Sequence, residues 1–481
     1  MAMGFINKTT TEGIETISLI EELIEKNKLS KAKQLCKSQA DKTSNDPKIL
    51  LLLSKIAIKE ADTDTAMQFL FTALKEAPRD QKIQLELAKL LYSARGSYPE
   101  AAQAALNILR QINAADCSGS AQLLLAKIFT DSNYLEEAIN NIKNALISNP
   151  KDEQAYIQWA KVLIKEGKNT EAFQKLEQAL YLNPHLSEAY FLLSEISSFN
   201  DPKSKFLEQI RETLRHKKLS RQEKTFLNLA LAKGLQDVKD YQTAFEHYIE
   251  ANNQKNKDLN YDITKDEKLF DDLKKVFSRN VFNKTSTNEN GKDLLFIISF
   301  PGSQDESYLK NLLENNKKLA YLGENSFLSQ MFIGSRHSKD FINYIENFTR
   351  LDNDSLEIFR NHYLENVEKI VGEHTPLDNS KMNFMYLGLI KILFPKAKVI
   401  YLKEEKEEAL FQTYTKLYEE ESMNFSYNLK ILNRFHNIFD QLMEYWLDLF
   451  PNEIEIVNPV RERIPAELLN KFKSHLNELT K

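Results

Sequence analysis

Small and large residues recur through the first half of the chain at fixed offsets within a 34-residue period. The pattern is clearest in windows that begin at residues 47, 119, 153 and 225. The positions that carry it in the windows at 153 and 119 are Trp159, Ala160, Ala172, Leu176, Ala179 and Pro184, and Leu125, Ala126, Ala138, Ile142, Ala145 and Pro150. The windows at 47 and 225 supply Leu53, Ser54, Ala66, Leu70, Ala73 and Pro78, and Leu231, Ala232, Ala244, Tyr248 and Ala251. Helix amphipathicity fixes neither the alanines nor the period, so the pattern predicts stacked helix pairs that cross closely at the small residues.

This period and spacing are typical of tetratricopeptide repeats. Weaker copies begin near residues 13, 81 and 187. The copy at 81 carries an insertion at residues 96–99, and the copy at 187 has Pro202 inside its second helix, where a proline interrupts the backbone hydrogen bonds. We therefore predict an all-α, right-handed tetratricopeptide solenoid of about six or seven helix pairs over residues 10–255.

Length and composition agree with a second domain behind the solenoid. The chain has 481 residues, of which 42% are hydrophobic, enough to bury two cores. Its formal net charge of −5 predicts no bulk attraction to nucleic acid or to an anionic membrane. The sequence shows neither a signal-peptide pattern nor an apolar run of about 18 residues, and Cys36 and Cys117 sit in helical patterns as expected of reduced core thiols. We expect a cytoplasmic protein without membrane insertion.

One charged position recurs along the repeats. It is the ninth residue of the first helix, and it is occupied by Lys55, Lys89, Lys127, Lys161 and Lys233. In the window at 187 the same position is Glu195. If the solenoid stacks regularly, these ammonium groups line its concave face, where closely spaced like charges favour a nearby anion. The row predicts an acidic protein or peptide partner, although lysine is also favoured at exposed helix positions for helix propensity alone.

The pattern changes after the repeats. Residues 256–291 are polar and contain a predicted helix at 266–277, and residues 293–300 form an apolar run typical of a buried parallel strand. A turn at 301–306 and an amphipathic helix at 307–319 follow. A strand, a tight turn and a helix N-terminus form a natural phosphate cradle. Residues 292–481 are therefore predicted to be an α/β domain with a parallel sheet, joined to the solenoid by a helical linker.

Several segments resemble one family in the same order. Residues 221–262, 383–390, 393–400 and 439–446 are similar to the bacterial tetratricopeptide-repeat sulfotransferases, and the similarity runs over nearly the whole chain. The resemblance implies a P-loop-like sulfotransferase-type domain. It also implies transfer of a sulfonyl group from 3′-phosphoadenosine-5′-phosphosulfate to a hydroxyl, as the tyrosylprotein sulfotransferases do.

The residues that such a domain uses to hold its cofactor are largely replaced. The family loop Pro-Arg-Ser-Gly-Thr-Thr is here Pro301-Gly302-Ser303-Gln304-Asp305-Glu306, which lacks the arginine and carries two carboxylates. The lysine that assists the leaving group falls on Asn379, with Lys381 two residues away, and the Arg-Arg-Asp-Pro segment aligns with Lys403-Glu404-Glu405-Lys406. The resemblance thus leaves Gly302, Ser303, Gln304, Lys381 and Lys403 as degenerate cofactor positions, and Glu324, which matches the family's Gly-Glu, as a candidate general base.

Three functions follow from this sequence. The favoured one is a protein-binding scaffold fused to an inactive sulfotransferase-like domain, with no cofactor and no metal. The alternative is a working protein sulfotransferase that still binds 3′-phosphoadenosine-5′-phosphosulfate. In a third, Glu324, Asp305 and Glu306 serve a cation or a basic substrate.

Overall fold

The fold comes from a computed structural model that describes residues 16–40, 45–60, 62–94, 100–111, 119–131, 134–215, 218–257, 259–282, 293–303, 306–322, 328, 339–418, 420–459 and 464–480. The chain divides into two compact units, Met1–Gln158 and Trp159–Lys481. The boundary falls inside one helix of the repeat array, so the second unit contains both the last repeats and the sheet.

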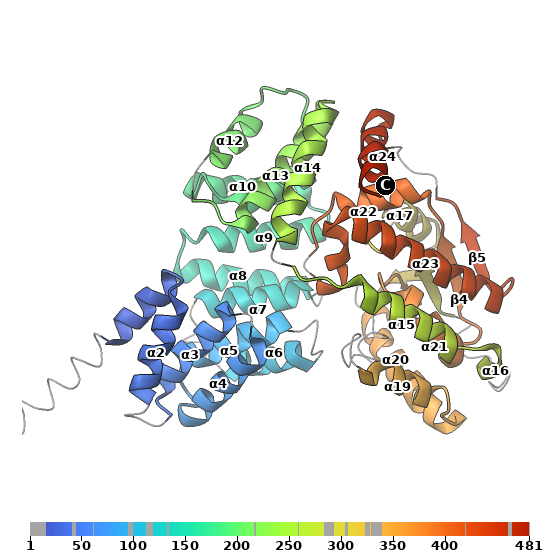
Figure 1. Ribbon diagram of the computed structural model, residues 1–481, viewed down its shortest axis with the longest axis horizontal. Helices are drawn as coiled ribbons and strands as arrows, with labels where there is room; N and C mark the ends of the chain where they lie inside the picture. The colour runs from blue at the N-terminus through green and yellow to red at the C-terminus, as the bar shows by residue number, and fades with distance from the viewer. Residues whose placement is uncertain are drawn as a thin grey trace, which may run out of the picture. The chain divides into compact units, whose positions relative to one another are not determined.

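The first unit consists of helix pairs (Figure 1). Residues 16–25 are helical, and they are followed by α2 (Leu29–Ala40), α3 (Pro47–Lys59), α4 (Thr63–Glu76), α5 (Gln81–Ser93), α6 (Glu100–Gln111), α7 (Gly119–Asp131) and α8 (Leu135–Ser148). Helices α3 and α4, α5 and α6, and α7 and α8 pack as antiparallel partners. The aspartates Asp46, Asp62 and Asp80 cap α3, α4 and α5 by accepting backbone N–H bonds in the first turn.

The repeats continue in the second unit. They comprise α9 (Glu153–Lys165), which begins before the boundary, α10 (Asn169–Leu182), α11 (Ser187–Ile196), α12 (Lys205–Leu214), α13 (Arg221–Asp237) and α14 (Tyr241–Asn256). As predicted from Pro202, the second helix of the repeat at 187 is shortened, because α12 begins only at Lys205. A capping box of Ser220 and Glu223 begins α13.

The small residues of the 34-residue pattern lie where the prediction placed them. All are buried: Ser54, Ala66, Ala73, Ala126, Ala138, Ala145, Ala160, Ala172, Ala179, Ala232, Ala244 and Ala251. The tetratricopeptide-type helix pairs are therefore confirmed for the described part of the chain. The insertion at residues 96–99 lies outside it.

Behind the repeats, α15 (Ile263–Val276) and α16 (Arg279–Phe282) lead to a small parallel sheet. Its strands are β1 (Leu295–Ile298), β2 (Leu319–Tyr321), β3 (Thr375–Asp378), β4 (Lys398–Leu402) and β5 (Ile454–Val457). They lie in the order β2-β3-β1-β4-β5, and every neighbouring pair is parallel. The predicted parallel sheet and the helices at 266–277 and 307–319 are thus present, within a few residues of their predicted ends.

Both faces of the sheet are covered by helices, as a fully apolar parallel strand requires. Side chains alternate along a strand, so Leu295 and Ile297 pack towards Leu309 of α17 (Glu306–Asn315). Phe296 and Ile298 belong to the larger core on the other face. That core is built from α15, α19 (Lys339–Phe348), α20 (Asn353–Val371), α21 (Asn383–Leu393), α22 (Lys406–Tyr414), the 3-10 helix η2 (Glu421–Tyr427), α23 (Leu429–Leu449) and α24 (Ala466–Thr480).

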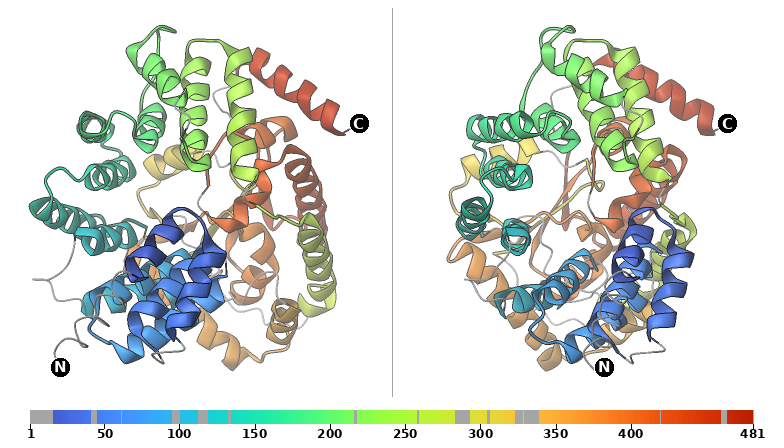
Figure 2. Two further views of the ribbon diagram at one scale, coloured as in Figure 1. Left: turned by 60° about the vertical axis from the view of Figure 1, so that its left-hand side comes forward. Right: turned by 90° about the vertical axis from the view of Figure 1, so that its left-hand side faces the viewer.

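The last repeat helix shares this core. Helix α24 packs against α14 (Figure 2), with the rings of Phe245 and Phe472 at 6.2 Å. The buried Asn252 amide of α14 donates to the backbone oxygen of Tyr414 at 2.8 Å. The domain boundary expected near residue 255 therefore lies within a continuously packed region of the second unit.

Two further predictions concern single properties. Cys36 is a buried free thiol, and burial raises its pKa to about 11; Cys117 lies outside the described residues. Across the ranges described above, no helix combines the length and apolar character needed to cross a bilayer.

Candidate functional site

The candidate site lies where β1 and β4 end. The chain leaves β1 towards β2 on one side of the sheet and leaves β4 towards β5 on the other. In parallel α/β sheets, ligands bind outside the carboxyl ends of two such strands. We call residues 299–303 and 403–405, which follow β1 and β4, the β1–β4 edge.

The turn after β1 depends on Gly302. This residue has φ of +89°, a conformation that glycine adopts at little cost. A Cβ at this position would lie 2.2 Å from Tyr418 Oη and 3.0 Å from Thr413 Cγ2. Tyr418 Oη lies 3.4 Å from the Gly302 oxygen, and Thr413 Oγ1 donates to the Pro301 oxygen at 3.0 Å. The two side chains therefore fill the space directly against the turn.

A carboxylate of the chain itself meets the hydroxyl of this turn. Ser303 is fully buried, and its Oγ lies 3.0 Å from Glu404 Oε1 and 2.8 Å from the Phe300 oxygen. A serine hydroxyl has one proton to donate, so the two acceptors share it. Glu404 thus stands beside the group that a phosphate would need as a donor, and it belongs to the segment aligned with Arg-Arg-Asp-Pro.

The two lysines predicted as cofactor positions, Lys381 and Lys403, have different surroundings. Lys381 Nζ lies 3.0 Å from Glu420 Oε1 and 5.6 Å from the centre of the Tyr418 ring, so its charge is already compensated by a carboxylate and an aromatic face. Lys403 is exposed, and its backbone N–H extends the pairing with β5 by donating to the Val457 oxygen at 2.9 Å.

The remaining predicted positions cannot be placed. Gln304, Asp305 and Glu324 lie outside the described residues, as does the side chain of Glu306. Their suggested roles therefore stay predictions. Among the residues that the structure does describe, no group of three or more His, Cys, Asp or Glu side chains is arranged to hold a metal ion.

The structure adds a buried polar network at the end of β3. Tyr363 Oη and Asn383 Nδ2 each donate to the Asp378 carboxylate at 3.0 Å, and the Ser380 N–H donates to it at 3.1 Å. Burial raises the pKa of the Asp378 carboxyl, while these three bonds act in the opposite direction. Asp378 and Asn383 lie on either side of the predicted positions Asn379 and Lys381, but the sequence does not reveal that they contact each other. The network holds the end of β3 to the start of α21.

The lysine row of the repeats is partly neutralised within the chain. Lys89 pairs with Glu86 at 2.8 Å, Lys161 with Glu188 at 2.6 Å and Lys233 with Asp237 at 2.6 Å. Lys127 Nζ lies 5.9 Å from the centre of the Tyr92 ring, and Lys55 is half-buried on α3. The repulsion that favoured an external anion is therefore already reduced at these three pairs.

Comparisons with known proteins do not identify the chain. No family model matches it. A protein of Aquifex aeolicus (strain VF5), itself described as uncharacterized, is 26% identical over 260 residues, which are 51% of this chain and 34% of that protein. The chain thus spans about a third of the length of this curated relative.

Solved structures that resemble the chain contain helical repeats. A tetratricopeptide repeat protein from Parabacteroides merdae ATCC 43184 has 14% identity and a TM-score of 0.40, covering 50% of this chain and 92% of its own. PilF of Pseudomonas aeruginosa has 16% identity and a TM-score of 0.35, covering 47% and 95%. MamA of Desulfovibrio magneticus RS-1 has 16% identity and a TM-score of 0.31, covering 36% and 94%. Such low scores carry no functional argument, and none of these proteins is described as a sulfotransferase.

Proposed function

We propose that this chain is a cytoplasmic protein-binding scaffold whose sulfotransferase-like α/β part no longer binds a sulfonate donor. The contact between Ser303 and Glu404 carries the proposal. A turn that would offer its hydroxyl to a phosphate instead meets an acidic side chain. Stacked helix pairs, for their part, build extended surfaces suited to protein segments.

The magnitude of the electrostatic effect supports the loss of the donor. Two unit negative charges about 4 Å apart repel by about 1 kcal/mol in water and by about 4 kcal/mol at the effective dielectric near a protein surface. A phosphate beside Ser303 would approach Glu404 to about this distance. Tyr418 and Thr413 also fill the space beside Gly302, the residue before Ser303 in the turn.

Calorimetry with 3′-phosphoadenosine-5′-phosphate tests this part of the proposal. We expect no binding by the full chain up to about millimolar concentration, whereas micromolar affinity would restore the sulfotransferase alternative. Glu404→Gln should raise the affinity roughly fivefold or more, because it removes at least about 1 kcal/mol of repulsion. Glu444→Gln, on an exposed part of α23, is the control and should change nothing.

The scaffold part is tested on the lysine row. We propose an acidic protein segment as the partner, and expect Lys127→Glu and Lys161→Glu to weaken its capture, while Lys151→Glu in an exposed loop leaves it unchanged. Lys161→Glu also places a second carboxylate beside Glu188. The exchanged pair Lys161→Glu with Glu188→Lys keeps the ion pair, so recovery of capture in that variant would trace the loss to local misfolding and remove Lys161 from the interface.

A further inference from the structure

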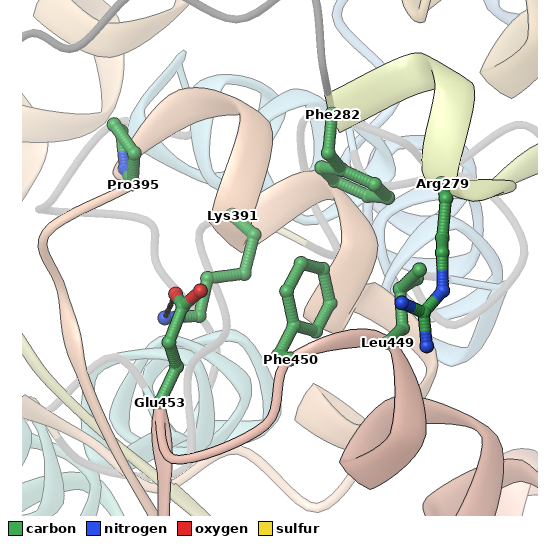
Figure 3. A pocket seen from close by; sticks show the side chains of 7 residues that line it. All are labelled: Arg279, Phe282, Lys391, Pro395, Leu449, Phe450 and Glu453. Atoms are coloured by element: carbon green, nitrogen blue, oxygen red, sulfur yellow. Dashed lines mark hydrogen bonds and ion pairs between the residues drawn. The ribbon is translucent and has the colours of Figure 1, made fainter.

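A second site lies on the opposite edge of the sheet from the β1–β4 edge. It is a cavity of about 490 Å³ formed by α16, the end of α21 and the turns that precede β4 and β5 (Figure 3). This volume is in the range of pockets that hold small molecules. Its walls are Phe282, Leu449, Phe450 and Pro395, and its charged groups are Lys391, Glu453 and Arg279.

The local sequence explains the shape of this cavity. Pro451 disfavours a helical conformation for the residue before it, and α23 accordingly ends at Leu449 with Phe450 as its cap. Asn452 then adopts φ of +66°, which asparagine tolerates, and the Glu453 N–H donates back to the Phe450 oxygen at 3.2 Å. The turn thereby presents Phe450 and Glu453 to the cavity, and Phe450 meets Phe282 edge to face at 4.8 Å.

Lys391 is the unusual residue of this cavity. All eleven residues of α21 are buried, and Lys391 is the one charged residue among them, with a side chain only 4% exposed. Its Nζ donates to Glu453 Oε2 at 2.9 Å and lies 5.8 Å from the Phe450 ring centre. Burying an ammonium is costly, and an apolar side chain of similar length would fill the position without that cost. Retaining the charge therefore points to a use for it.

The N–H donors of Lys391 indicate the chemistry of the ligand. Lys391 pairs with Glu453 at 2.9 Å and Arg279 pairs with Asp448 at 3.0 Å, so these four charges balance. An ammonium has three N–H donors, and the structure uses one of them on Glu453. In Figure 3 the Phe450 ring lies between the Lys391–Glu453 pair and the Arg279 side chain. The Arg279 guanidinium donates to the Asp448 carboxylate at 3.0 Å. A ligand carboxylate can thus join Lys391 while an apolar body lies on the aromatic wall.

We propose that this cavity binds a small monocarboxylate with an aromatic or other apolar body. The carboxylate takes the N–H donors of Lys391 that Glu453 leaves open, and the body packs against Phe450 and Phe282. Arg279, 64% exposed and paired with Asp448 at 3.0 Å, lies at the mouth. This site is independent of the scaffold function proposed above.

The test uses the full chain with 3-phenylpropionate as the probe. Binding of the probe is measured by ligand-observed NMR titration. The matched probes 3-phenylpropanol and 3-phenylpropylamine have the same body with no charge and the opposite charge. Ligands of this size bind at about the millimolar level, given about 0.3 kcal/mol per non-hydrogen atom. We expect the carboxylate to bind about tenfold tighter than the alcohol. Equal binding of the two, preference for the amine, or no saturation by the carboxylate would each overturn the proposal.

Variants identify the residues. Lys391→Met should weaken 3-phenylpropionate about tenfold, and Glu453→Gln should tighten it several-fold because it removes the competing carboxylate. Lys473→Met removes a cation from α24 elsewhere in the same unit and should have no effect. Should Lys391→Met fail to fold, Glu453→Gln and the exposed Arg279→Gln decide: unchanged affinity in both refutes the site.

Discussion

Replacing Gly302 by alanine tests whether Tyr418 fills the turn after β1 in solution. The new Cβ would lie 2.2 Å from Tyr418 Oη and 3.0 Å from Thr413 Cγ2, and the backbone would keep φ of +89°. Unfavourable backbone geometry costs about 1–3 kcal/mol, and an extra carbon in a filled space costs about as much again. We expect Gly302→Ala to lower the free energy of unfolding of the second unit by about 2–6 kcal/mol.

A second substitution separates the two contributions. Tyr418→Phe alone should cost about 1 kcal/mol or less, because the hydroxyl is 3.4 Å from the Gly302 oxygen. With the hydroxyl gone, the nearest atoms to the new Cβ are the ring Cζ and Thr413 Cγ2, both at 3.0 Å. The backbone strain remains while most of the overlap is relieved. The double variant should therefore be about 1–2 kcal/mol more stable than the sum of the single changes predicts.

The assay is urea unfolding followed by Trp446 fluorescence in a Trp159→Phe background. Trp446 is fully buried in the core beside the sheet, so it reports the unit that contains the turn. Gly372→Ala is the matched control, because Gly372 also has positive φ, +58°, but no atom lies within 4 Å of a Cβ there. Gly372→Ala should lower the free energy of unfolding by the backbone strain alone. Its effect should add to that of Tyr418→Phe without coupling. Additive costs for Gly302→Ala and Tyr418→Phe would refute the placement of Tyr418 against the turn.

Further predictions concern three buried groups. Because burial raises the pKa of Asp378, the folded state holds this proton to a higher pH than the unfolded chain does. The stability that the group contributes is therefore present below the ordinary pKa of 3.8 and is lost as the pH rises. From about pH 4 to pH 7 the urea midpoint should fall relative to that of Asp378→Asn, and a flat difference would contradict this. Asn252→Ala should lower the unfolding free energy by about 1–3 kcal/mol, since it leaves the Tyr414 oxygen without its amide donor; a cost near zero by the same urea assay would argue against that contact. In a Cys117→Ser background, the Cys36 thiol, with a pKa raised to about 11, should react slowly with a disulfide reagent at about pH 8 until urea is added, and rapid native labelling would show that it is exposed.

The repeat half of the fold was predictable because its physical requirement is local. Close helix crossings need small residues at fixed offsets, and the sequence displays those offsets directly. Ala126 and Ala138, for example, are both fully buried at the predicted crossing. The strand at 293–300 was predictable for a similar reason, since a short apolar run bounded by a turn is too short for a helix and fits a buried strand.

The site depended on contacts between distant segments. Ser303 and Glu404 are 101 residues apart, and no pattern in either segment reveals that they meet. The strand order that brings them together follows from packing of the whole sheet. Glu404 was recognised as a departure from an aligned motif, but its contact with the turn was not.

The lysine row also contains both kinds of contact, those within one helix and those between distant segments. Lys233 and Asp237 lie four residues apart on one helix, so their pairing is predictable from the sequence. The pairing of Lys161 with Glu188 joins two helices and is not predictable in this way. The lysine positions alone therefore indicate more positive charge than the row carries once its ion pairs are counted.

The contact of α24 with α14 limits how the repeat array can change in evolution. Solenoids gain and lose whole repeats where one helix pair stacks on the next. A duplicated repeat placed after α14 would have to displace α24 and separate Phe472 from Phe245 and Phe411, which lie 6.2 and 5.5 Å from it. Differences in repeat number among related chains should consequently occur upstream of α13, away from this contact.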